Sequence, residues 1–319
     1  MTIKEIREKI ENVIDPSRGK SLKELKAIKH IGINEEKNSV VLIVELGKLK
    51  GPHEEQVKRE LAKIIKIDLE FNGIKIQFEE NKTISSISNK NTEIILVSSA
   101  KGGTGKSSVC LNLAYALTRQ NKKVAIIDND IYCASISKMM GIKNTTVNVD
   151  AMNKILPYTK DGIEIISTDF FSDEENPLMW RGSMLASMTN NFLFQVSWSK
   201  DLDYILIDCP NGTGDILLDL GQFLPTASVL LVSEDDMLSA ANVLKAARAH
   251  ELMKQALIGI VINKYKGNKY AENYLSDKLA IETLAKIPYT ELKANNYLFE
   301  EDTKAYEEFN DLATLIITR

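Results

Sequence analysis

Beyond residue 92, apolar residues gather in short continuous runs that are separated by segments long enough to form helices. The runs cover residues 94–97, 124–127, 163–166, 204–207, 229–232 and 257–262. A continuous apolar run is typical of a strand whose two faces are both covered, as in parallel sheets flanked by helices. The pattern therefore predicts an α/β fold with a doubly wound, mostly parallel sheet, in which ligands bind at the carboxyl ends of the strands.

The first 80 residues follow a different pattern. A helix-like segment is followed by a break at Asp15-Pro16 and then by alternating strand-like and helix-like segments. Helices are expected near residues 3–14 and 54–65, and strands at 40–46 and 74–78. These elements predict a small α+β domain over residues 1–80. Residues 81–91 are polar and serine-rich with little to bury, which favours a linker. The larger domain is then expected to span residues 92–319.

The segment Lys101-Gly-Gly-Thr-Gly-Lys-Ser107 lies between an expected strand at 93–98 and an expected helix at 107–120. Strand, glycine-rich loop and helix form the context of a phosphate-binding loop. The glycines let backbone N–H groups approach phosphate oxygens at the positive end of the helix dipole. Lys106 would reach the β- and γ-phosphates of a nucleotide, and the Ser107 hydroxyl would bind Mg²⁺. A second lysine, Lys101, is unusual, since an ordinary loop of this kind carries one.

Carboxylates follow two of the expected strands. Asp128 and Asp130 come after the run at 124–127, and Asp208 comes directly after the run at 204–207. A hydrophobic strand that ends in aspartate commonly holds Mg²⁺ through a water. Asp208 is therefore the candidate for this position, and the three carboxylates are expected at strand ends beside the phosphate loop.

Two further segments carry polar groups to the same edge of the expected sheet. The segment from Asp208 to Asp215 contains two glycines and a proline, which suits a loop that changes conformation when a γ-phosphate is present. Asn263 follows the run at 257–262 and has both the donor and the acceptor that an adenine edge requires. The residues expected to bind the nucleotide are Gly102, Gly103, Thr104, Gly105, Lys106, Ser107, Ser108 and Asn263.

Composition and charge narrow the range of partners. The chain has 319 residues and a formal net charge of −4, which argues against nucleic-acid or anionic-membrane partners. The N-terminus is charged and helix-like, and no apolar run reaches the length of a membrane span, so a cytoplasmic protein is expected. The three cysteines, Cys110, Cys133 and Cys209, lack the spacing of disulfides or zinc ligands. They are expected to be small buried residues.

The two-lysine loop resembles the deviant Walker A loop of the ParA/MinD class of dimeric ATPases. More narrowly, Asp128-Asn-Asp-Ile-Tyr132, Asn176-Pro-Leu-Met-Trp-Arg-Gly182 and Asp208-Cys-Pro-Asn-Gly-Thr-Gly-Asp215 resemble motifs of the Mrp/NBP35 (ApbC) family, the iron–sulfur cluster carrier ATPases. The first 80 residues resemble the MIP18-type (DUF59) domain, with Asp15-Pro16 and Gly19 at the turn after the first helix. No catalytic role is assigned to Trp180 or Arg181.

The resemblance implies an ATP-sandwich homodimer in which Lys101 reaches the nucleotide of the other subunit. A cation delivered in this way stabilises the charge of the phosphoryl oxygens as an arginine finger does. Asp130 would orient the attacking water, which makes Lys101, Lys106 and Asp130 the catalytic residues. ATP and Mg²⁺ are the implied ligands, with Ser107 and Asp208 on the metal. Asp128 and Asp215 would belong to the switch that senses the γ-phosphate.

The chain departs from the resembled family at its cluster ligands. The family normally carries a Cys-x-x-Cys pair shortly after the adenine-site asparagine, but residues 263–270 contain no cysteine. The Gly-Cys-Pro often found in the N-terminal domain is replaced around residues 50–53. Iron–sulfur clusters need soft thiolates, which lysine and glycine cannot replace. Cys133 and Cys209 lie beside the switch segments, so two subunits could offer four thiolates there.

Three functions remain open at this point. The first is an Mg-ATP-dependent ATPase acting in iron–sulfur cluster assembly or transfer, with an iron–sulfur apo-protein as a candidate client. The second is a positioning or regulatory ATPase of the MinD/ParA kind. The third is a nucleotide-binding scaffold with little turnover. The tail 306–319 is apolar on one side and acidic on the other, which predicts a packed terminal helix and not the basic membrane helix of the second class.

Overall fold

The computed structural model divides the chain into two compact units, Met1–Thr83 and Ile84–Arg319. It describes residues 2–16, 19–25, 27–34, 37–46, 52–80, 92–131, 133–143, 145, 147–171, 182–212, 215–290 and 297–319. The segment 81–91, predicted to be a linker, lies outside these residues, as do Trp180 and Arg181.

The smaller unit is a three-stranded sheet packed against two helices. Its elements are α1 (Ile3–Ile10), β1 (Ile14–Asp15), β2 (Lys20–Ser21), β3 (Ile28–Asn34), β4 (Ser39–Leu46), α2 (Pro52–Lys63), a π-helical turn (Ile64–Asp68) and β5 (Gly73–Glu80). In the order β3-β4-β5, β4 is antiparallel to β3 and parallel to β5. Alternate residues of β4 are buried, and they share one core with Ile6 and Ile10 of α1. The strand β3 was not predicted, because a register shift between Ile28 and His30 breaks its alternation.

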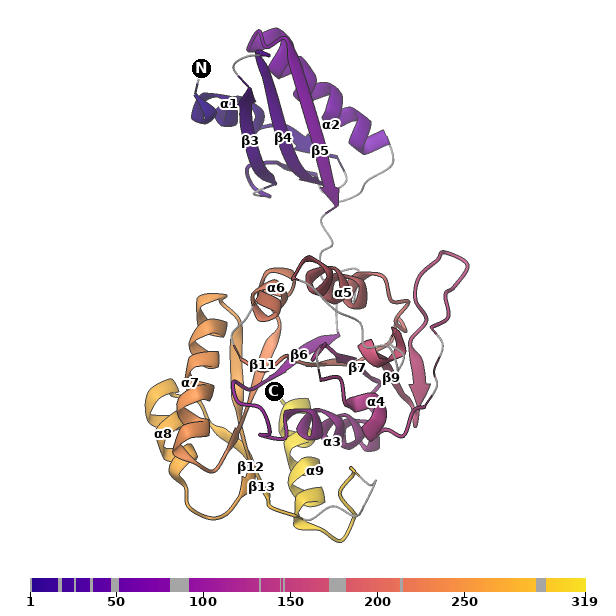
Figure 1. Cartoon of the computed structure of the whole chain (residues 1–319), viewed down its shortest axis with the longest axis vertical. Coiled ribbons are helices and arrows are strands. Elements are labelled where there is room, and N and C mark those ends of the chain that lie inside the picture. The colour runs from indigo at the N-terminus through magenta and orange to yellow at the C-terminus, as the bar shows by residue number, and fades with distance from the viewer. Residues whose placement is uncertain are drawn as a thin grey trace. The chain divides into compact units, whose positions relative to one another are not determined.

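The larger unit is built on an eight-stranded sheet (Figure 1). Its elements are β6 (Glu93–Ser98), α3 (Lys106–Arg119), β7 (Val124–Asp128), α4 (Ile136–Met139), β8 (Tyr158–Lys160), β9 (Ile163–Ser167), a 3₁₀ turn (Thr168–Phe171), α5 (Gly182–Phe194), β10 (Tyr204–Asp208), α6 (Asp215–Phe223), β11 (Ser228–Glu234), α7 (Met237–Leu252), β12 (Ala256–Tyr265), α8 (Tyr270–Leu279), β13 (Thr283–Pro288) and α9 (Lys304–Ile317). The strand order is β13-β12-β11-β6-β10-β7-β9-β8, and every pairing is parallel except that of β8 with β9. The predicted doubly wound, mostly parallel fold is confirmed.

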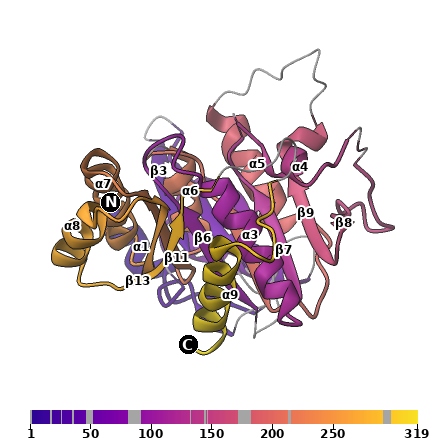
Figure 2. The ribbon, with the colours of Figure 1, turned by 90° about the horizontal axis from the view of Figure 1, so that it is seen from below.

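Helices cover both faces of this sheet because successive strand residues point to opposite sides. Ile94 and Leu96 of β6 belong to one core with residues of α5, α6 and α7, whereas Ile95 and Val97 belong to the other with α3 and α9. The helices α3 and α9 lie side by side on that second face (Figure 2). Phe309 of α9 is buried there, so the chain's last helix is packed, as its sequence predicted.

The strand order brings the polar strand ends together. Strand β10 lies between β6 and β7, and Asp208 pairs in register with Val97 on one side and Asp128 on the other. The phosphate loop begins directly after β6, so it lies beside both aspartates. No helix in the described part of the chain is long and apolar enough to cross a membrane.

Candidate functional site

The glycine-rich loop connects β6 to α3, which begins at Lys106. Gly103 and Gly105 have φ values of 85° and 80°, a left-handed conformation that glycine adopts without strain. A Cβ at Gly105 would also lie 2.2 Å from Asn263 Nδ2, so this position needs glycine for a close approach as well. The loop leads straight into the first turn of α3, where free N–H groups and the helix dipole favour an anion. Ser107 and Ser108 lie in that turn.

Lys106 is buried at the inner end of the loop, with an exposure of 4%. Its ammonium donates a hydrogen bond to Asp208 Oδ1 and lies 3.7 Å from Asp130 Oδ2. Burial by itself lowers the pKa of Lys106, but the charges of Asp208 and Asp130 outweigh burial and raise it. Lys106 is therefore a fixed cation, and we call Lys106, Asp130 and Asp208 the inner end of the phosphate loop.

Two neighbouring carboxylates, Asp208 and Asp128, are fully buried. Asp208 Oδ2 and Asp128 Oδ1 have no hydrogen-bond partner within the described residues. The other oxygen of Asp128 accepts the N–H groups of Ser135 and Ile136 at 3.0 and 3.1 Å and the hydroxyl of Ser167 at 3.1 Å. Burial and the charge of Asp208 raise the pKa of Asp128 to about 8. In this structure Asp128 holds the start of α4, the helix that follows β7 in the chain.

Asp130 connects the inner end to the segment that follows β10. Its Oδ2 accepts a hydrogen bond from Asn211 Nδ2 at 3.1 Å, and the Gly212 N–H donates to Ser99 O, at the start of the phosphate loop, at 3.3 Å. Burial raises the pKa of Asp130 even though Lys106 opposes the shift. Asn211 was missed in the sequence, although its place in the predicted switch segment could have indicated it. Asp215 opens α6, and its side chain lies outside the described residues.

Asn263, two residues before the end of β12, lies against the phosphate loop. Its Nδ2 donates to Thr104 O at 2.7 Å, and the side chain is buried. The structure therefore brings Asn263 to the predicted loop through a contact that the sequence did not indicate. Asn112 of α3 was also missed: it donates to Tyr297 O at 3.0 Å and accepts the Phe299 N–H at 3.1 Å. It ties the segment after residue 296 to the helix that carries the loop.

Lys101 lies at the other end of the loop and is held by acidic residues of its own chain. Its ammonium is 2.9 Å from Glu234 Oε2 and 3.5 Å from Asp236 Oδ2. Lys264 reaches the other oxygen of Glu234 at 2.7 Å and donates to Gly103 O at 2.5 Å. We call Lys101, Glu234, Asp236 and Lys264 the outer end of the phosphate loop.

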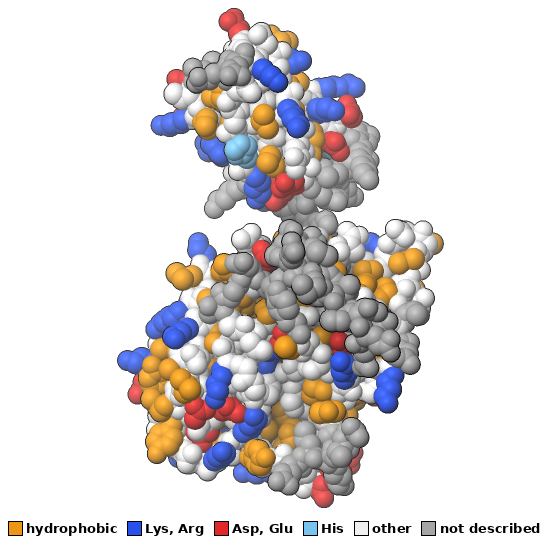
Figure 3. Space-filling view, viewed as in Figure 1, with side chains coloured by type: hydrophobic (Ala, Val, Ile, Leu, Met, Phe, Trp, Pro, Cys, Tyr) orange, Lys and Arg blue, Asp and Glu red, His pale blue; other side chains and the backbone are white. Residues whose placement is uncertain are grey.

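The outer end is partly open to solvent, unlike the inner end. The side chain of Lys101 is 32% exposed, and its hydrogen bond to Glu234 raises its pKa. Acidic and basic side chains gather on the face that Figure 3 shows, over the region where α7 and β12 lie in Figure 1. Glu234, Asp236 and Lys264 were missed in the sequence, although acids that follow an apolar strand could have indicated the first two.

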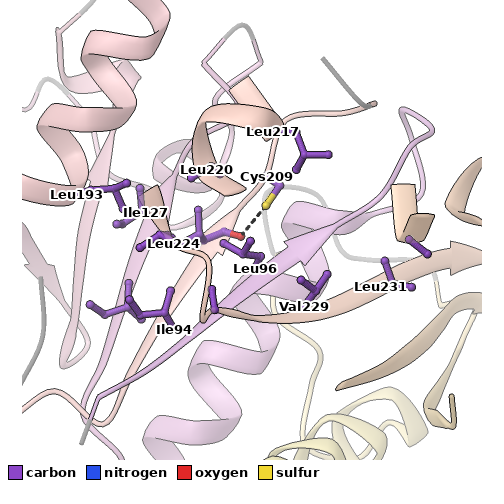
Figure 4. Close-up of a cluster of buried hydrophobic side chains, with 14 of the residues drawn as sticks. Ile94, Leu96, Ile127, Leu193, Cys209, Leu217, Leu220, Leu224, Val229 and Leu231 are labelled. Atoms are coloured by element: carbon purple, nitrogen blue, oxygen red, sulfur yellow. Dashed lines mark hydrogen bonds between the residues drawn. The ribbon is translucent and has the colours of Figure 1, made fainter. Parts of the chain in front are cut away.

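The cysteines do not form the predicted alternative cluster site. Cys209 is fully buried among apolar side chains, where its thiol contacts Ile207 O at 3.7 Å (Figure 4). Burial raises the pKa of its thiol, and the same holds for Cys110. The prediction that the cysteines are small buried residues is confirmed for Cys110 and Cys209 and wrong for Cys133, which is exposed. The idea that Cys133 and Cys209 together offer four thiolates across two subunits is therefore wrong for Cys209. Among the described residues, no group of three or more His, Cys, Asp or Glu side chains is placed to hold a metal ion.

With this geometry in view, comparison with known proteins identifies the family. The family model described as ParA, NUBPL iron-transfer P-loop NTPase, matches residues 90–289. The chain belongs to this family. An iron–sulfur cluster carrier protein of Bacillus subtilis is 32% identical over 310 residues, which cover 89% of this chain and 87% of the relative. Another, from Rickettsia felis, is 32% identical over 76% of this chain and 77% of its own length.

Two solved structures are similar to this chain in fold. A nucleotide-binding protein from Archaeoglobus fulgidus, solved in complex with ADP, is 29% identical with a TM-score of 0.57 and covers 75% of this chain and 93% of its own. The cell division ATPase MinD of Pyrococcus furiosus has a TM-score of 0.56 at 22% identity and covers 71% of this chain and 98% of its own. The second likeness concerns the fold alone.

Proposed function

We propose that the protein is an Mg-ATP-dependent dimeric ATPase that acts in iron–sulfur cluster assembly or transfer. One observation carries this proposal: a single phosphate loop presents one lysine buried between two aspartates and a second lysine near solvent. The buried lysine suits a nucleotide of its own subunit, and the outer lysine suits a nucleotide of another. This division of roles supports ATP as the nucleotide and a homodimer as the active assembly.

The inner end has the groups that a nucleotide with Mg²⁺ requires. Asp208 Oδ2 is a buried carboxylate oxygen without a hydrogen-bond partner in the described part of the chain, and Ser107 lies in the first turn of α3. Carboxylate and hydroxyl oxygens are ligands that Mg²⁺ prefers, so these two residues would hold it. Mg²⁺ bound here would neutralise charge on the β- and γ-phosphates. Lys106 would exchange Asp208 for phosphate oxygens, and Asn263 would lie near the base.

Hydrolysis would depend on both ends of the loop. Asp130 belongs to the inner end and would orient the attacking water, while Lys101 of the other subunit would stabilise the charge of the transferred phosphoryl group. The contact of Gly212 with Ser99 and that of Asn211 with Asp130 connect the segment 208–215 to the site. That segment, together with Asp128 at the start of α4, would move with the γ-phosphate. The smaller unit would be a MIP18-like domain that recruits a client protein.

A second candidate is a regulatory ATPase of the MinD/ParA kind that carries no cluster. The burial of Cys110 and Cys209 favours it, since both thiols are held in apolar surroundings and Cys133 alone faces solvent. The chain also has no cysteine between Asn263 and its end. Both functions share the ATPase cycle and differ in cargo.

Mixing two inactive variants tests the division of roles between the lysines. Lys101→Ala should keep ATP binding and lose hydrolysis, whereas Lys106→Ala should lose binding. An equal mixture of Lys101→Ala and Asp130→Ala should recover about a quarter of the wild-type rate, because about half of the dimers are mixed and each mixed dimer has one complete site. No recovery, with each variant still binding ATP and dimerising, would contradict the proposal.

Anaerobic reconstitution with iron and sulfide separates the two candidates. Iron content and the visible spectrum would be measured for the wild type and for Cys133→Ser, with Cys209→Ser as the matched control. A chromophore that Cys133→Ser removes and Cys209→Ser keeps would support a carrier. Absence of any thiolate-dependent chromophore in the wild type would support the regulatory ATPase.

A further inference from the structure

Lys264, at the outer end of the phosphate loop, has an unusual backbone conformation. Its φ is 51°, in the left-handed region that residues other than glycine and asparagine seldom adopt. The pairing of β12 with β13 shifts register between Ile262 and Tyr265, so the strand is irregular at this residue. Such a conformation persists only where surrounding contacts hold the residue in place.

The ammonium of Lys264 joins two parts of the site. It donates to the carbonyl of Gly103 inside the phosphate loop at 2.5 Å and pairs with Glu234 Oε1 at 2.7 Å. The other oxygen of Glu234 holds Lys101. A single carboxylate is thus shared by two lysines, and one of these lysines also holds the loop backbone.

We infer that Lys264 is a positioning residue that supports the phosphate loop at Gly103 and, by sharing Glu234, weakens the hold of that carboxylate on Lys101. This inference rests on the proposed transfer of Lys101 to a second subunit, and it concerns how that transfer is controlled. When Lys101 contacts the nucleotide of the other subunit, Glu234 still pairs with Lys264, so its carboxylate is not left unpaired. Lys264 itself stays on its own loop in both states.

The physical basis is the sharing of charge on one carboxylate. Burial raises the pKa of Glu234, but hydrogen bonds from Lys264 and Lys101 outweigh burial and lower it, so the group is ionised. If one of the two lysines is removed, the full negative charge of Glu234 acts on the lysine that remains. Loss of Lys264 should therefore tighten the contact between Glu234 and Lys101, and loss of Glu234 should leave Lys101 with the weaker contact to Asp236 alone.

The first test measures the reactivity of Lys101 without nucleotide. The full chain would be treated with an amine-acylating ester, and the acylation rate of Lys101 would be followed by mass spectrometry. Lys264→Asn fits the left-handed backbone and removes the ammonium, and Lys264→Gly is a second variant that fits it. Lys101 should react about two- to fivefold more slowly in Lys264→Asn and about two- to fivefold faster in Glu234→Gln, the range for a partly exposed ion pair. Lys264→Arg should stay near the wild type.

Lys266→Asn is the matched control, because it removes the same charge from an exposed side chain two positions away. The inference is overturned if Lys101 in Lys264→Asn reacts at the rate of this control or faster. This readout needs neither ATP nor a dimer. If the proposed ATPase cycle were wrong, Lys101→Ala would instead hydrolyse ATP at the wild-type rate.

The second test separates positioning from a purely structural role through kcat and KM. Lys264→Asn should lower kcat, because Lys101 is released less readily, and raise KM for ATP, because Gly103 loses its support. Adding Glu234→Gln should restore kcat to that of Glu234→Gln alone while KM stays high. A double variant that is worse than either single variant in kcat would overturn the inference.

Discussion

Lys106 and Lys101 lie at opposite ends of one glycine-rich loop, yet their surroundings differ in burial and in how their charge is balanced. Lys106 is 4% exposed and lies between Asp208 and Asp130, whereas Lys101 is held by Glu234 and Asp236 at a partly open surface. The inner contacts are desolvated and therefore hard to break without a replacement charge. The outer contacts are screened by water and can be exchanged at small cost.

This difference suits two distinct tasks. A lysine that must meet the phosphates of its own subunit benefits from a fixed position, and desolvated carboxylates supply it until phosphate takes their place. A lysine that is to reach another subunit must leave its own, so a weak and shared partner is appropriate. Four substitutions test this comparison, and their expected effects on stability decrease in the order given below.

Lys106→Met should reduce stability most. It leaves the buried carboxylates of Asp208 and Asp130 without their cation, and breaking a buried pair in this way costs about 3–5 kcal/mol in the free energy of unfolding. Urea unfolding without nucleotide measures it, with Lys123→Met, which removes an exposed pairing to Asp201, as the control. Equal stability of the two variants would show that the inner end is not desolvated.

Asp128→Asn should change the pH dependence of stability. The pKa of Asp128 is about 8 in the folded chain, above its unfolded value near 3.9, so between these values the folded chain holds a proton that the unfolded chain has released. The free energy of unfolding therefore falls as pH rises, by at most about 3 kcal/mol between pH 6 and 8. Asparagine accepts the same hydrogen bonds without titrating. Denaturation at the two pH values should show a flatter profile in the variant, and an unchanged slope would contradict this account.

Gly105→Ala should reduce stability by about 2 kcal/mol, because alanine is strained at a φ of 80° and its Cβ would displace the Asn263 amide from Thr104. Gly102→Ala is the matched control, since a Cβ there meets nothing within 4 Å. Thermal unfolding of the two variants measures the difference. If both melt at the same temperature, the close approach of Asn263 does not stabilise the loop.

Lys101→Met should have the smallest effect on stability, less than about 1 kcal/mol, because its partners are partly exposed and solvent screens the pair. The loss should shrink further as salt is raised. Unfolding measured at low and high ionic strength tests this. If the free energy of unfolding fell by much more and salt did not change the loss, Lys101 would be held as firmly as Lys106, and the two ends of the loop would not differ.

Much of the fold could be predicted because parallel strands covered on both faces are continuously apolar. The runs at 94–97, 124–127 and 204–207 lie within β6, β7 and β10, and the aspartates after them lie where a parallel sheet puts its strand ends. The strands β3 and β13 were missed. A register shift interrupts the alternation of β3, whereas β13 is short and buries only Ala285 and Ile287 on either side of a lysine, so neither has an apolar run.

The parts of the candidate site that a local motif forms could be predicted from the sequence. The parts that side chains from distant segments complete could not. Glycines in the loop and a lysine at the helix start are neighbours in the chain, so their spacing is visible. Glu234 and Lys264 reach the loop from β11 and β12, and Asn211 reaches Asp130 from the end of β10. Nothing in their local sequence specifies those partners. Cys133 was misjudged for the same reason, because burial of a small side chain depends on packing by distant segments.

The parallel sheet, the phosphate loop and the acids at the strand ends are specified locally in the sequence, because they depend on apolar runs and on residues close together in the chain. Which charges meet depends on the folded chain. The tertiary structure placed Lys106 between two buried aspartates and Lys101 on a carboxylate shared with Lys264. The physical reason is that the strength of an ion pair depends on burial and on neighbours from other strands, and only the folded chain brings these together.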